Sequence, residues 1–357
     1  MNLSVINIKF STNVIMPKKD SLNSILERFL KDSSGIYRTG NTGYWSNLSK
    51  DENTTLRNSI NSLGPNKAVK ELIPHLYDMI YDPKREAALD LFTYKPNATC
   101  LDFGCMWGVL SVGASKRFKN VISLDQTYES LYFLNHRCKE EKIENISCIQ
   151  CDLKKIDFEN IADYAVVNGV LEWIPIDESV EVDKFHQNSD APGKTINLRP
   201  KDMQVNFLKV VYKSLKKDGE IVLAIENRHS YQYYMGMKDP HVNLFFTTFM
   251  PRFISNFISL IFRKRPYRNF IYSFNDIRKL VGLAGFKEVQ LYAAFPNYHF
   301  PEMILGYSKA GFENYERYPN KLRITYKQKI TYFVEIILMK YFRARFFSPA
   351  IIVKARK

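Results

Sequence analysis

The alternation of apolar and polar positions along residues 97–227 predicts strands and helices in turn. Short apolar runs alternate with segments whose apolar residues recur at helical spacing, an order typical of a parallel sheet with helices on both faces. Gly219 is expected to stop the last of these helices. The predicted strands are 98–104, 120–125, 146–152, 162–170 and 219–227, and the predicted helices are 108–118, 128–142 and 200–219.

The same pattern resumes later in the chain and completes the sheet. A helix over 273–286, with Ser273 as its N-cap and Asp276 in its first turn, precedes a sixth strand over 287–295. The last strand covers 348–355. We therefore predict an α/β fold with a doubly wound, mostly parallel, Rossmann-like sheet of seven strands.

The chain is expected to hold a helical N-terminal flank and one α/β domain. Residues 1–96 are predicted to form the mostly helical flank or cap, and residues 97–357 the domain. The domain has insertions at about 227–272 and 305–346, the second of which is expected to be helical from about residue 323 to 341. One core with such additions fits a chain of 357 residues.

Charge narrows the choice of partners. The chain has 51 Lys and Arg against 37 Asp and Glu, a formal net charge of +14, which attracts nucleic acid, anionic lipid or phosphorylated substrates. The N-terminus lacks the pattern of a secretory signal, and the most apolar long stretch, 242–262, is interrupted by Pro251 and Arg252. We expect a cytoplasmic protein that can also bind peripherally to the inner face of the membrane.

The five cysteines fit that compartment as reduced, mostly buried thiols. Cys148 and Cys151 form a CxxC, which can be half of a zinc site or a redox pair. A zinc site needs two more ligands, and the sequence offers no second CxxC and no close pair of histidines. We therefore expect no metal site.

The stretch LDFGCMWG (101–108) follows the first predicted strand of the domain, where a doubly wound sheet binds its ligand. Gly104 ends the strand and Gly108 opens the helix, as a tight turn close to a ligand requires. A nicotinamide-binding fingerprint needs glycines at relative positions one, three and six, but counting from Gly104 the other two are Met106 and Val109. The sequence therefore argues against a hydride-transfer enzyme.

This stretch resembles motif one of the class I S-adenosylmethionine methyltransferases, in which Leu-Asp-x-Gly runs into a Gly-x-Gly turn. The resemblance continues at Asp125, where that family holds the ribose hydroxyls, and at Asp152, where it contacts adenine. Residues 166–175, VVNGVLEWIP, resemble motif four, with Glu172 and Trp173 starting the next helix. The resemblance implies a methyltransferase with S-adenosylmethionine as cofactor. The cofactor-binding residues that it implies are Asp102, Gly104, Cys105, Met106, Gly108, Asp125, Gln126, Asp152, Leu153, Asn168 and Gly169.

Met106 departs from the family pattern, because it stands where the central glycine lets the backbone approach the cofactor. With a negative φ its side chain can point away and leave binding intact. With a positive φ it carries about 1–2 kcal/mol of strain, which weakens the site about tenfold without abolishing it. A catalytically silent, methyltransferase-like scaffold is therefore an alternative.

Residues 224–241, AIENRHSYQYYMGMKDPH, resemble a subset of bacterial and archaeal methyltransferases associated with surface-polysaccharide synthesis. This resemblance implies O-methylation of a saccharide or of a surface-glycan or lipid-linked precursor. Methyl transfer to a sugar hydroxyl needs a base and a clamp that holds the reacting atoms in line. The candidate catalytic residues are His241 with Asp239, or Glu226 with Asn227, and His229 is a weaker candidate.

Two basic segments suggest further partners. Residues 242–268 mix phenylalanines with Arg and Lys, which suits an anionic membrane surface, although a lid on the core or a dimer contact has the same composition. Residues 321–347 mix bases with aromatics, as single-strand binders do. Their apolar residues resemble a packing face, and NGVL (168–171) differs from the Asn-Pro-Pro-aromatic signature of enzymes that methylate exocyclic nitrogens. An RNA methyltransferase is thus the less favoured alternative, and the sequence leaves the oligomeric state open.

Overall fold

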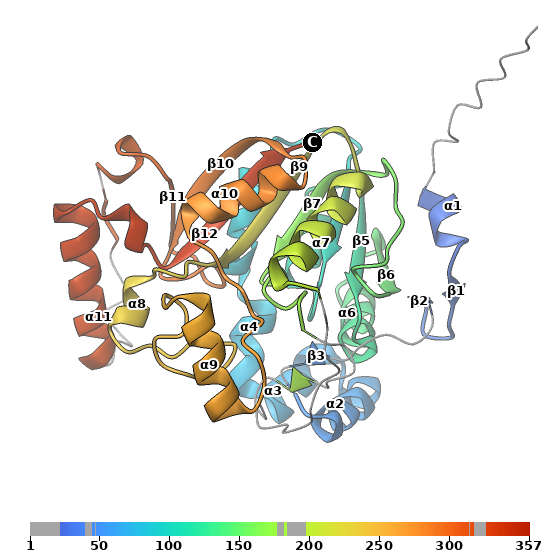
Figure 1. Cartoon of the computed structure of the whole chain (residues 1–357). Coiled ribbons are helices and arrows are strands. Elements are labelled where there is room, and N and C mark those ends of the chain that lie inside the picture. The colour runs from blue at the N-terminus through green and yellow to red at the C-terminus, as the bar shows by residue number, and fades with distance from the viewer. Residues whose placement is uncertain are drawn as a thin grey trace, which may run out of the picture.

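The structure is a computed structural model that describes residues 22–39, 45–46, 48–176, 182–183, 198–313, 315–317 and 326–357. Its centre is a ten-stranded sheet with the order β1-β2-β6-β5-β4-β7-β9-β12-β10-β11 (Figure 1). The seven central strands are β4 (Thr99–Phe103), β5 (Asn120–Asp125), β6 (Ile146–Gln150), β7 (Ala162–Asn168), β9 (Leu215–Glu226), β10 (Lys287–Phe295) and β12 (Ala350–Arg356).

The central strands confirm the predicted doubly wound, mostly parallel arrangement. Strands β6, β5, β4, β7 and β9 run parallel, whereas β12 is antiparallel to both β9 and β10. The sheet has ten strands rather than the expected seven, because short strands extend both edges. The two-residue strands are too short for a periodic signal. The added strands are β1 (Leu30–Lys31), β2 (Tyr37–Arg38) and β11 (Met303–Gly306).

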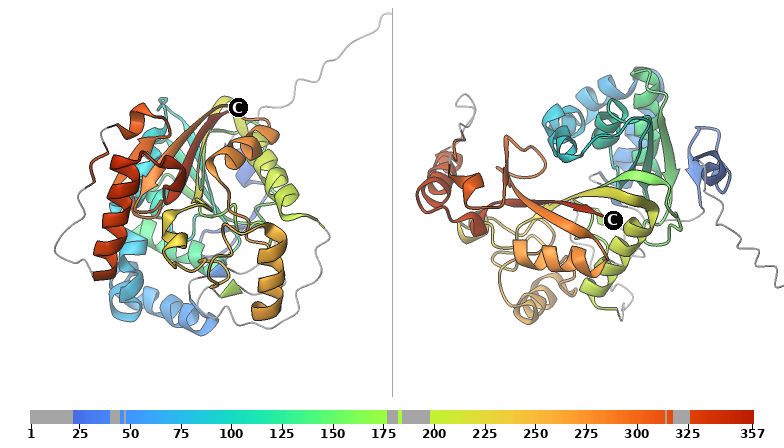
Figure 2. Two further views of the ribbon diagram at one scale, coloured as in Figure 1. Left: turned by 60° about the vertical axis from the view of Figure 1, so that its left-hand side comes forward. Right: turned by 90° about the horizontal axis from the view of Figure 1, so that it is seen from above.

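The sheet is buried on both faces, which explains its continuous apolar strands. In β4, Leu101 and Phe103 share a core with α7 (Pro200–Ser214) and α10 (Phe274–Leu283). Cys100 belongs to the core on the other face, which includes residues of α5 (Val109–Ser115), as neighbouring strand residues point to opposite faces. Helix α6 (Tyr128–Glu140) packs on β5 and β6. Seen from above, the sheet separates the two sets of helices (Figure 2).

The described part of the first 96 residues is mainly helical. Ser49 and Glu52 form a capping box at the start of α2 (Lys50–Leu63), and α2 and α3 (Pro65–Leu72) pack against α6. Strands β3 (Trp45–Ser46) and β8 (Val182–Asp183) form a separate two-stranded sheet. The remaining elements of this part are α1 (Leu22–Leu26), η1 (Pro74–Leu76), α4 (Tyr77–Tyr81) and η2 (Pro83–Leu91).

Three local predictions have different outcomes. Ser273 caps α10 as expected, because its side chain accepts a hydrogen bond from the backbone N–H of Asp276. The prediction that Gly219 stops the preceding helix is wrong: α7 ends at Ser214, where the backbone becomes extended and β9 begins to pair with β7. The prediction that Glu172 and Trp173 start a helix is also wrong, since both lie in consecutive turns.

The two late insertions carry their own helices. The first holds α8 (Tyr231–Tyr234) and α9 (Arg252–Arg263). The second holds η3 (Ala310–Phe312), α11 (Tyr326–Ile336), the π-helix η5 (Ile337–Tyr341) and η6 (Arg345–Phe347). The expected helix start near residue 323 lies outside the described residues. Among the described helices, none combines the length and apolar character needed to cross a membrane.

Candidate cofactor and acceptor site

A cavity of about 360 Å³ lies at the carboxyl ends of the central parallel strands, where doubly wound sheets bind ligands. It reaches from the loop after β4 to residues of the first insertion. The cavity thus brings together most of the side chains that the sequence singled out. Those that line it are Asp102, Gly104, Cys105, Met106, Asp125, Gln126, Asp152, Leu153, Asn168, Gly169, Glu226 and His241.

The loop after β4 needs its glycines for conformation and for space. Gly104 and Gly108 have φ angles of +75° and +77°, which side chains of L residues rarely adopt. A Cβ on Gly104 would lie 2.5 Å from Val170, and one on Gly108 would lie 2.2 Å from Leu134. Gly108 does not line the cavity, so its part in the loop is to begin α5 beneath it.

Met106 occupies the strained backbone conformation that the sequence analysis considered. Its φ is +48°, and its side chain packs against the core under α6 while it also lines the cavity. The backbone N–H of Met106 donates a hydrogen bond of 2.8 Å to Oδ2 of Asp125. This bond ties the loop to the end of β5 and offsets part of the strain.

Asp125 is held from two sides and faces the cavity. Its Oδ1 accepts a hydrogen bond of 2.9 Å from the backbone N–H of Thr127. Burial raises the pKa of Asp125 to about 6, although the N–H groups of Thr127 and Met106 oppose that rise. Each carboxylate oxygen has two acceptor positions, so both can still accept a ligand hydroxyl.

The pKa values of Asp102 and Asp152 are shifted in opposite directions by their surroundings. Burial raises the pKa of Asp102 to about 7, while a hydrogen bond of 2.6 Å from the Ser111 hydroxyl acts against that rise. Burial also acts to raise the pKa of Asp152, but its contact of 2.8 Å with Nζ of Lys155 and the N–H of Lys154 bring it below its usual range. Asp152 therefore presents a carboxylate to the cavity at neutral pH.

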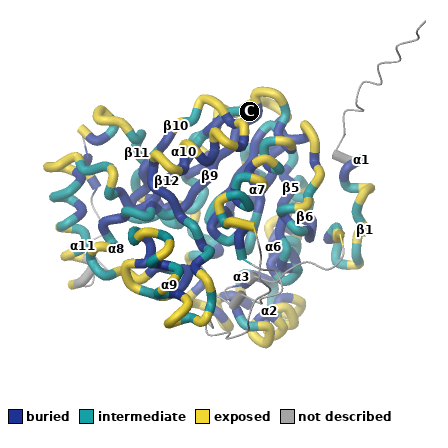
Figure 3. The backbone as a smooth tube through the Cα atoms, viewed as in Figure 1, coloured by how far each residue is buried: buried dark blue, intermediate teal, exposed yellow. Residues whose placement is uncertain are grey.

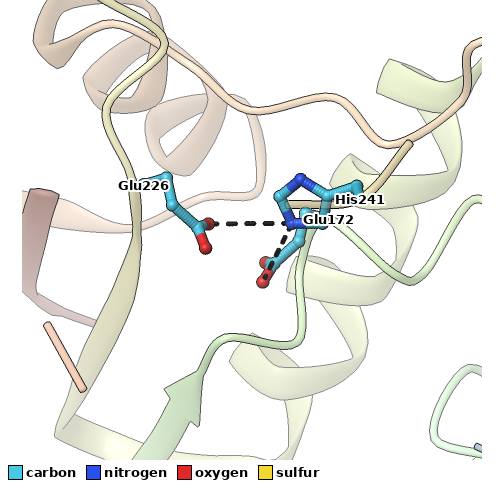
Figure 4. A group of neighbouring side chains, drawn as sticks. All are labelled: Glu172, Glu226 and His241. Atoms are coloured by element: carbon cyan, nitrogen blue, oxygen red, sulfur yellow. Dashed lines mark ion pairs between the residues drawn. The ribbon is translucent and has the colours of Figure 1, made fainter. Parts of the chain in front are cut away.

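Glu172, Glu226 and His241 line the cavity and lie together as a group of three side chains, here named the inner cluster (Figure 4). Nε2 of His241 lies 3.9 Å from Oε1 of Glu172 and 3.8 Å from Oε2 of Glu226. The side chains come from three separate places: the turn after β7, the end of β9 and the first insertion. Glu172 and His241 are almost fully buried, with side-chain exposures of 1% and 2%.

Asp239 fixes the other side of the His241 ring. Oδ1 of Asp239 accepts a hydrogen bond of 3.0 Å from Nδ1 of His241, and its Oδ2 accepts bonds from the hydroxyls of Tyr267 and Thr247. Burial by itself lowers the pKa of His241, but the charge of Glu226 and hydrogen bonds with Asp239 and Glu172 raise it to about 10. The ring is therefore protonated at neutral pH when the cavity holds no ligand.

Two candidate catalytic residues lie away from the cavity. The side-chain amide of Asn227 donates to the backbone carbonyls of Phe346 and Ser348, so it connects the end of β9 to the segment before β12. His229 stacks on Phe346, and its Nδ1 lies 3.2 Å from the hydroxyl of Tyr234. Both residues contact the segment before β12 or the first insertion, and neither lines the cavity.

The sequence analysis missed Arg85 and Tyr298, which also line the cavity. Arg85 comes from η2 in the N-terminal flank, and its Nε is buried without a hydrogen-bond partner among the described residues. Burial lowers the pKa of Arg85 to about 10, so it remains a cation at neutral pH. Tyr298 donates a hydrogen bond of 3.3 Å to Glu226. No motif signalled either residue: Arg85 lies in the flank before β4, and Tyr298 follows β10.

The described fold places a cavity at the carboxyl ends of parallel strands, the position at which doubly wound sheets bind their ligands. Residues 94–242 match a family model described as "Methyltransferase domain". This match covers the glycine loop, the acidic residues at the ends of β5 and β6, and the histidine of the inner cluster. It supports the methyltransferase domain that the sequence predicted. None of the curated proteins compared matches the chain.

Several solved structures are similar to the chain. Phosphoethanolamine N-methyltransferase 2 of Haemonchus contortus, in complex with phosphomonomethylethanolamine and S-adenosylhomocysteine, is 14% identical over 85% of this chain, with a TM-score of 0.44. The similarity spans only 60% of that protein. SAM-dependent methyltransferases of Thermotoga maritima and Aquifex aeolicus are 12% and 15% identical, over 82% and 64% of this chain and 97% and 92% of theirs, with TM-scores of 0.42 and 0.39. At such values the likeness identifies no acceptor.

Proposed function

We propose that this chain transfers the methyl group of S-adenosylmethionine to a hydroxyl oxygen of a saccharide or related glycan precursor. The observation that carries the proposal is the single cavity in which Asp125 and Asp152 adjoin the glycine loop while Glu226 and His241 belong to the inner cluster. One end can hold a nucleoside, and the other can hold a proton-accepting group next to the transferred methyl.

The cofactor-binding end has a partner for each part of the proposed cofactor. Asp125 would accept hydrogen bonds from the ribose hydroxyls, Leu153 and Gln126 would contact the adenine and Asp152 its amino group, and the glycine loop would hold the methionine part. The buried guanidinium of Arg85 supplies the counter-charge for the carboxylate of that methionine part. This pairing gives the buried Nε of Arg85 the acceptor that the described residues do not provide.

The chemical step moves one methyl group and one proton. The acceptor oxygen attacks the methyl carbon as the bond from that carbon to sulfur breaks, so S-adenosylhomocysteine leaves as a neutral thioether. The hydroxyl proton passes to the carboxylate of Glu226, beside the His241 ring. Asp239 holds that ring in place through Nδ1 and therefore acts as a positioning residue.

The acceptor class rests on the sequence resemblance of residues 224–241 and on the nature of the cavity wall. Beyond the inner cluster the wall includes Trp173, Gln232 and Asn297. Amide groups can hydrogen-bond the hydroxyls of a sugar, and an indole ring can cover its apolar face. The same wall lacks a cluster of arginines for phosphates among the described residues, which favours a saccharide over RNA.

The test begins with calorimetric titration of the purified chain with S-adenosylmethionine and S-adenosylhomocysteine. We expect micromolar binding that Asp125→Ala removes, whereas Asp90→Asn, at an exposed carboxylate outside the cavity, leaves it unchanged. Transfer of a labelled methyl group is then measured with sugar nucleotides, lipid-linked saccharides and RNA. Cofactor binding by a folded protein without transfer to any saccharide contradicts the acceptor. No binding of either cofactor form supports the silent scaffold.

We also propose that α9 contacts an anionic membrane surface, because several of its large apolar residues are exposed. Figure 3 shows exposed positions along this helix. Phe253 and Phe257 are 76% and 64% exposed, whereas Ser255 and Ser259 are buried and donate hydrogen bonds to backbone carbonyls. A helix packed on a core buries its apolar residues and exposes its polar ones, so α9 shows the opposite arrangement. The basic stretch 263–265 follows directly and can meet lipid phosphates.

Co-sedimentation with vesicles tests this contact. At low salt we expect binding to vesicles that contain anionic lipid, and loss of binding in the double variant Phe253→Ser, Phe257→Ser. The matched control is Phe333→Ser, which changes an equally exposed phenylalanine on α11. Absence of binding by the unmodified chain, or equal loss in the control, contradicts the proposal.

A further inference from the structure

We propose that Glu172, Glu226 and His241 form a binding site for a divalent metal ion beside the proposed cofactor. The sequence predicted no metal site, because these residues lie 54 and 15 positions apart along the chain, without a recognised ligand spacing. The fold brings one ligand atom from each to within 4.8 Å of the others. The binding of the ion does not depend on the proposed function. A catalytic role for the ion does rest on that function.

The separations suit a shared ion. Two ligands on one ion lie at most about 4.2 Å apart when each bond is about 2.1 Å long. The Nε2 of His241 is 3.8 Å from Glu226 and 3.9 Å from Glu172, so an ion fits between the ring and either carboxylate. Figure 4 shows all three side chains pointing toward one another. The ligand atoms, which lie within 4.8 Å of one another, would draw closer around a bound ion, because ligands at tetrahedral angles with bonds of about 2.1 Å lie about 3.4 Å apart.

Asp239 orients the His241 ring so that Nε2 can bind a metal ion. A histidine ligand usually donates its other N–H to a carboxylate, which fixes the tautomer and orients the ring. Here Nδ1 of His241 donates to Asp239, and Nε2 is the nitrogen that faces Glu172 and Glu226. Asp239 is in turn held by Tyr267 and Thr247, so the ring cannot easily rotate.

Glu172 gives an independent indication of a missing partner. Its side chain is 1% exposed and lines the cavity, yet its Oε2 has no hydrogen-bond partner among the described residues. A buried carboxylate oxygen without a hydrogen-bond partner is costly. Together with Glu226 and Asp239 it places three carboxylates around one imidazole, an excess of negative charge that a divalent cation would balance.

The ligand set indicates the kind of ion. Two carboxylates and one imidazole suit Mn²⁺, Fe²⁺ or Zn²⁺ better than an all-oxygen ion such as Mg²⁺. In the proposed reaction an acceptor hydroxyl would occupy an open position on the ion, which would lower the pKa of that hydroxyl and fix its oxygen for attack. The proton would still pass to a carboxylate oxygen of the cluster, so the same bonds form and break as in the step without the ion.

Mn²⁺ is the probe of choice, because sulfur ligands such as the buried thiols of Cys148 and Cys151 compete poorly for it. The full chain is treated with a chelator, dialysed and titrated with MnCl₂, and the free ion is followed by its electron paramagnetic resonance signal. We expect one bound ion per chain and at least a tenfold weaker affinity in Glu172→Gln and in Glu226→Gln. Asp90→Asn, whose carboxylate lies outside the cavity, is the matched control.

S-adenosylhomocysteine binding is measured on the same samples and separates the two proposals. Retained binding of S-adenosylhomocysteine shows that each variant is folded. If the folded chain binds the cofactor product but no Mn²⁺, or if both glutamine variants bind Mn²⁺ as tightly as the unmodified chain does, the metal site is overturned while the proposed function stands. If Mn²⁺ binds as expected but S-adenosylhomocysteine does not, the proposed function fails and the metal site stands.

Discussion

Gly108 combines two demands that only glycine meets. Its φ of +77° lies in the left-handed region, and a Cβ there would lie 2.2 Å from Cδ1 of Leu134 in α6. The residue therefore couples the cofactor loop to the helix beneath it. Gly236 has a similar φ of +82° but open space around it, which makes it a matched reference.

We predict that Gly108→Ala lowers the free energy of unfolding by about 2–4 kcal/mol, from about 1–2 kcal/mol of backbone strain and a similar cost of overpacking. Gly236→Ala should lower the free energy of unfolding by the backbone strain alone, because the added Cβ meets no neighbouring atom. Equilibrium urea denaturation of both variants measures the difference. Equal effects at the two positions would mean that the Leu134 side chain moves aside without cost.

Asp125 makes cofactor binding sensitive to pH. Its pKa is raised to about 6, so the carboxylate is ionised at neutral pH and becomes protonated as the pH falls below 6. Because the ionised form is the better acceptor for ribose hydroxyls, we predict that affinity for S-adenosylhomocysteine falls toward tenfold per pH unit below 6. Titration between pH 5 and 7 measures it, and Asp125→Asn should remove this part of the dependence. A flat profile in the unmodified chain would contradict the role.

Among the elements of the chain, those of the second insertion are held together by one buried carboxylate. Glu335 of α11 is fully buried, and it accepts hydrogen bonds from Nε of Arg317 at 2.7 Å and from the hydroxyls of Tyr231 and Tyr315. Tyr231 belongs to α8 of the first insertion, so this carboxylate joins the two insertions. Both late additions are therefore attached to each other as well as to the sheet.

We predict that Glu335→Gln lowers the free energy of unfolding by about 3 kcal/mol, because it leaves the buried Arg317 without one of its charge partners. Glu316→Gln removes an exposed carboxylate 4.0 Å from Lys340 and should change stability by less than about 0.5 kcal/mol. Urea denaturation of the two variants distinguishes them. A small effect at position 335 would show that the insertions are attached mainly by apolar packing.

At the scale of the whole molecule, the cavity connects the N-terminal flank, the sheet and the first insertion. Arg85 comes from the flank, Asp125 from β5 and His241 from the insertion. A ligand that contacts all three would stabilise the folded chain as a unit. The free energy gained from a ligand at 100 times its dissociation constant is about 2.7 kcal/mol.

We accordingly predict that S-adenosylhomocysteine at that excess raises the midpoint of thermal unfolding by a few degrees. The shift should disappear in Asp125→Ala and persist in Asp90→Asn. Differential scanning calorimetry measures it. A shift of the same size in both variants would place the ligand outside the cavity.

The order of the strands and the position of the glycine loop could be predicted from the sequence, because strand and helix periodicity and glycine at a tight turn are local properties. Asp125, Asp152 and Glu226 could also be predicted, since strand ends in a parallel sheet meet at one edge, and His241 was found by the resemblance of residues 224–241. That Arg85 and Glu172 complete the cavity, and that Asn227 serves the fold instead, became visible in the three-dimensional structure alone. Which side chains meet across distant loops depends on packing over the whole chain, and no local pattern of residues records it.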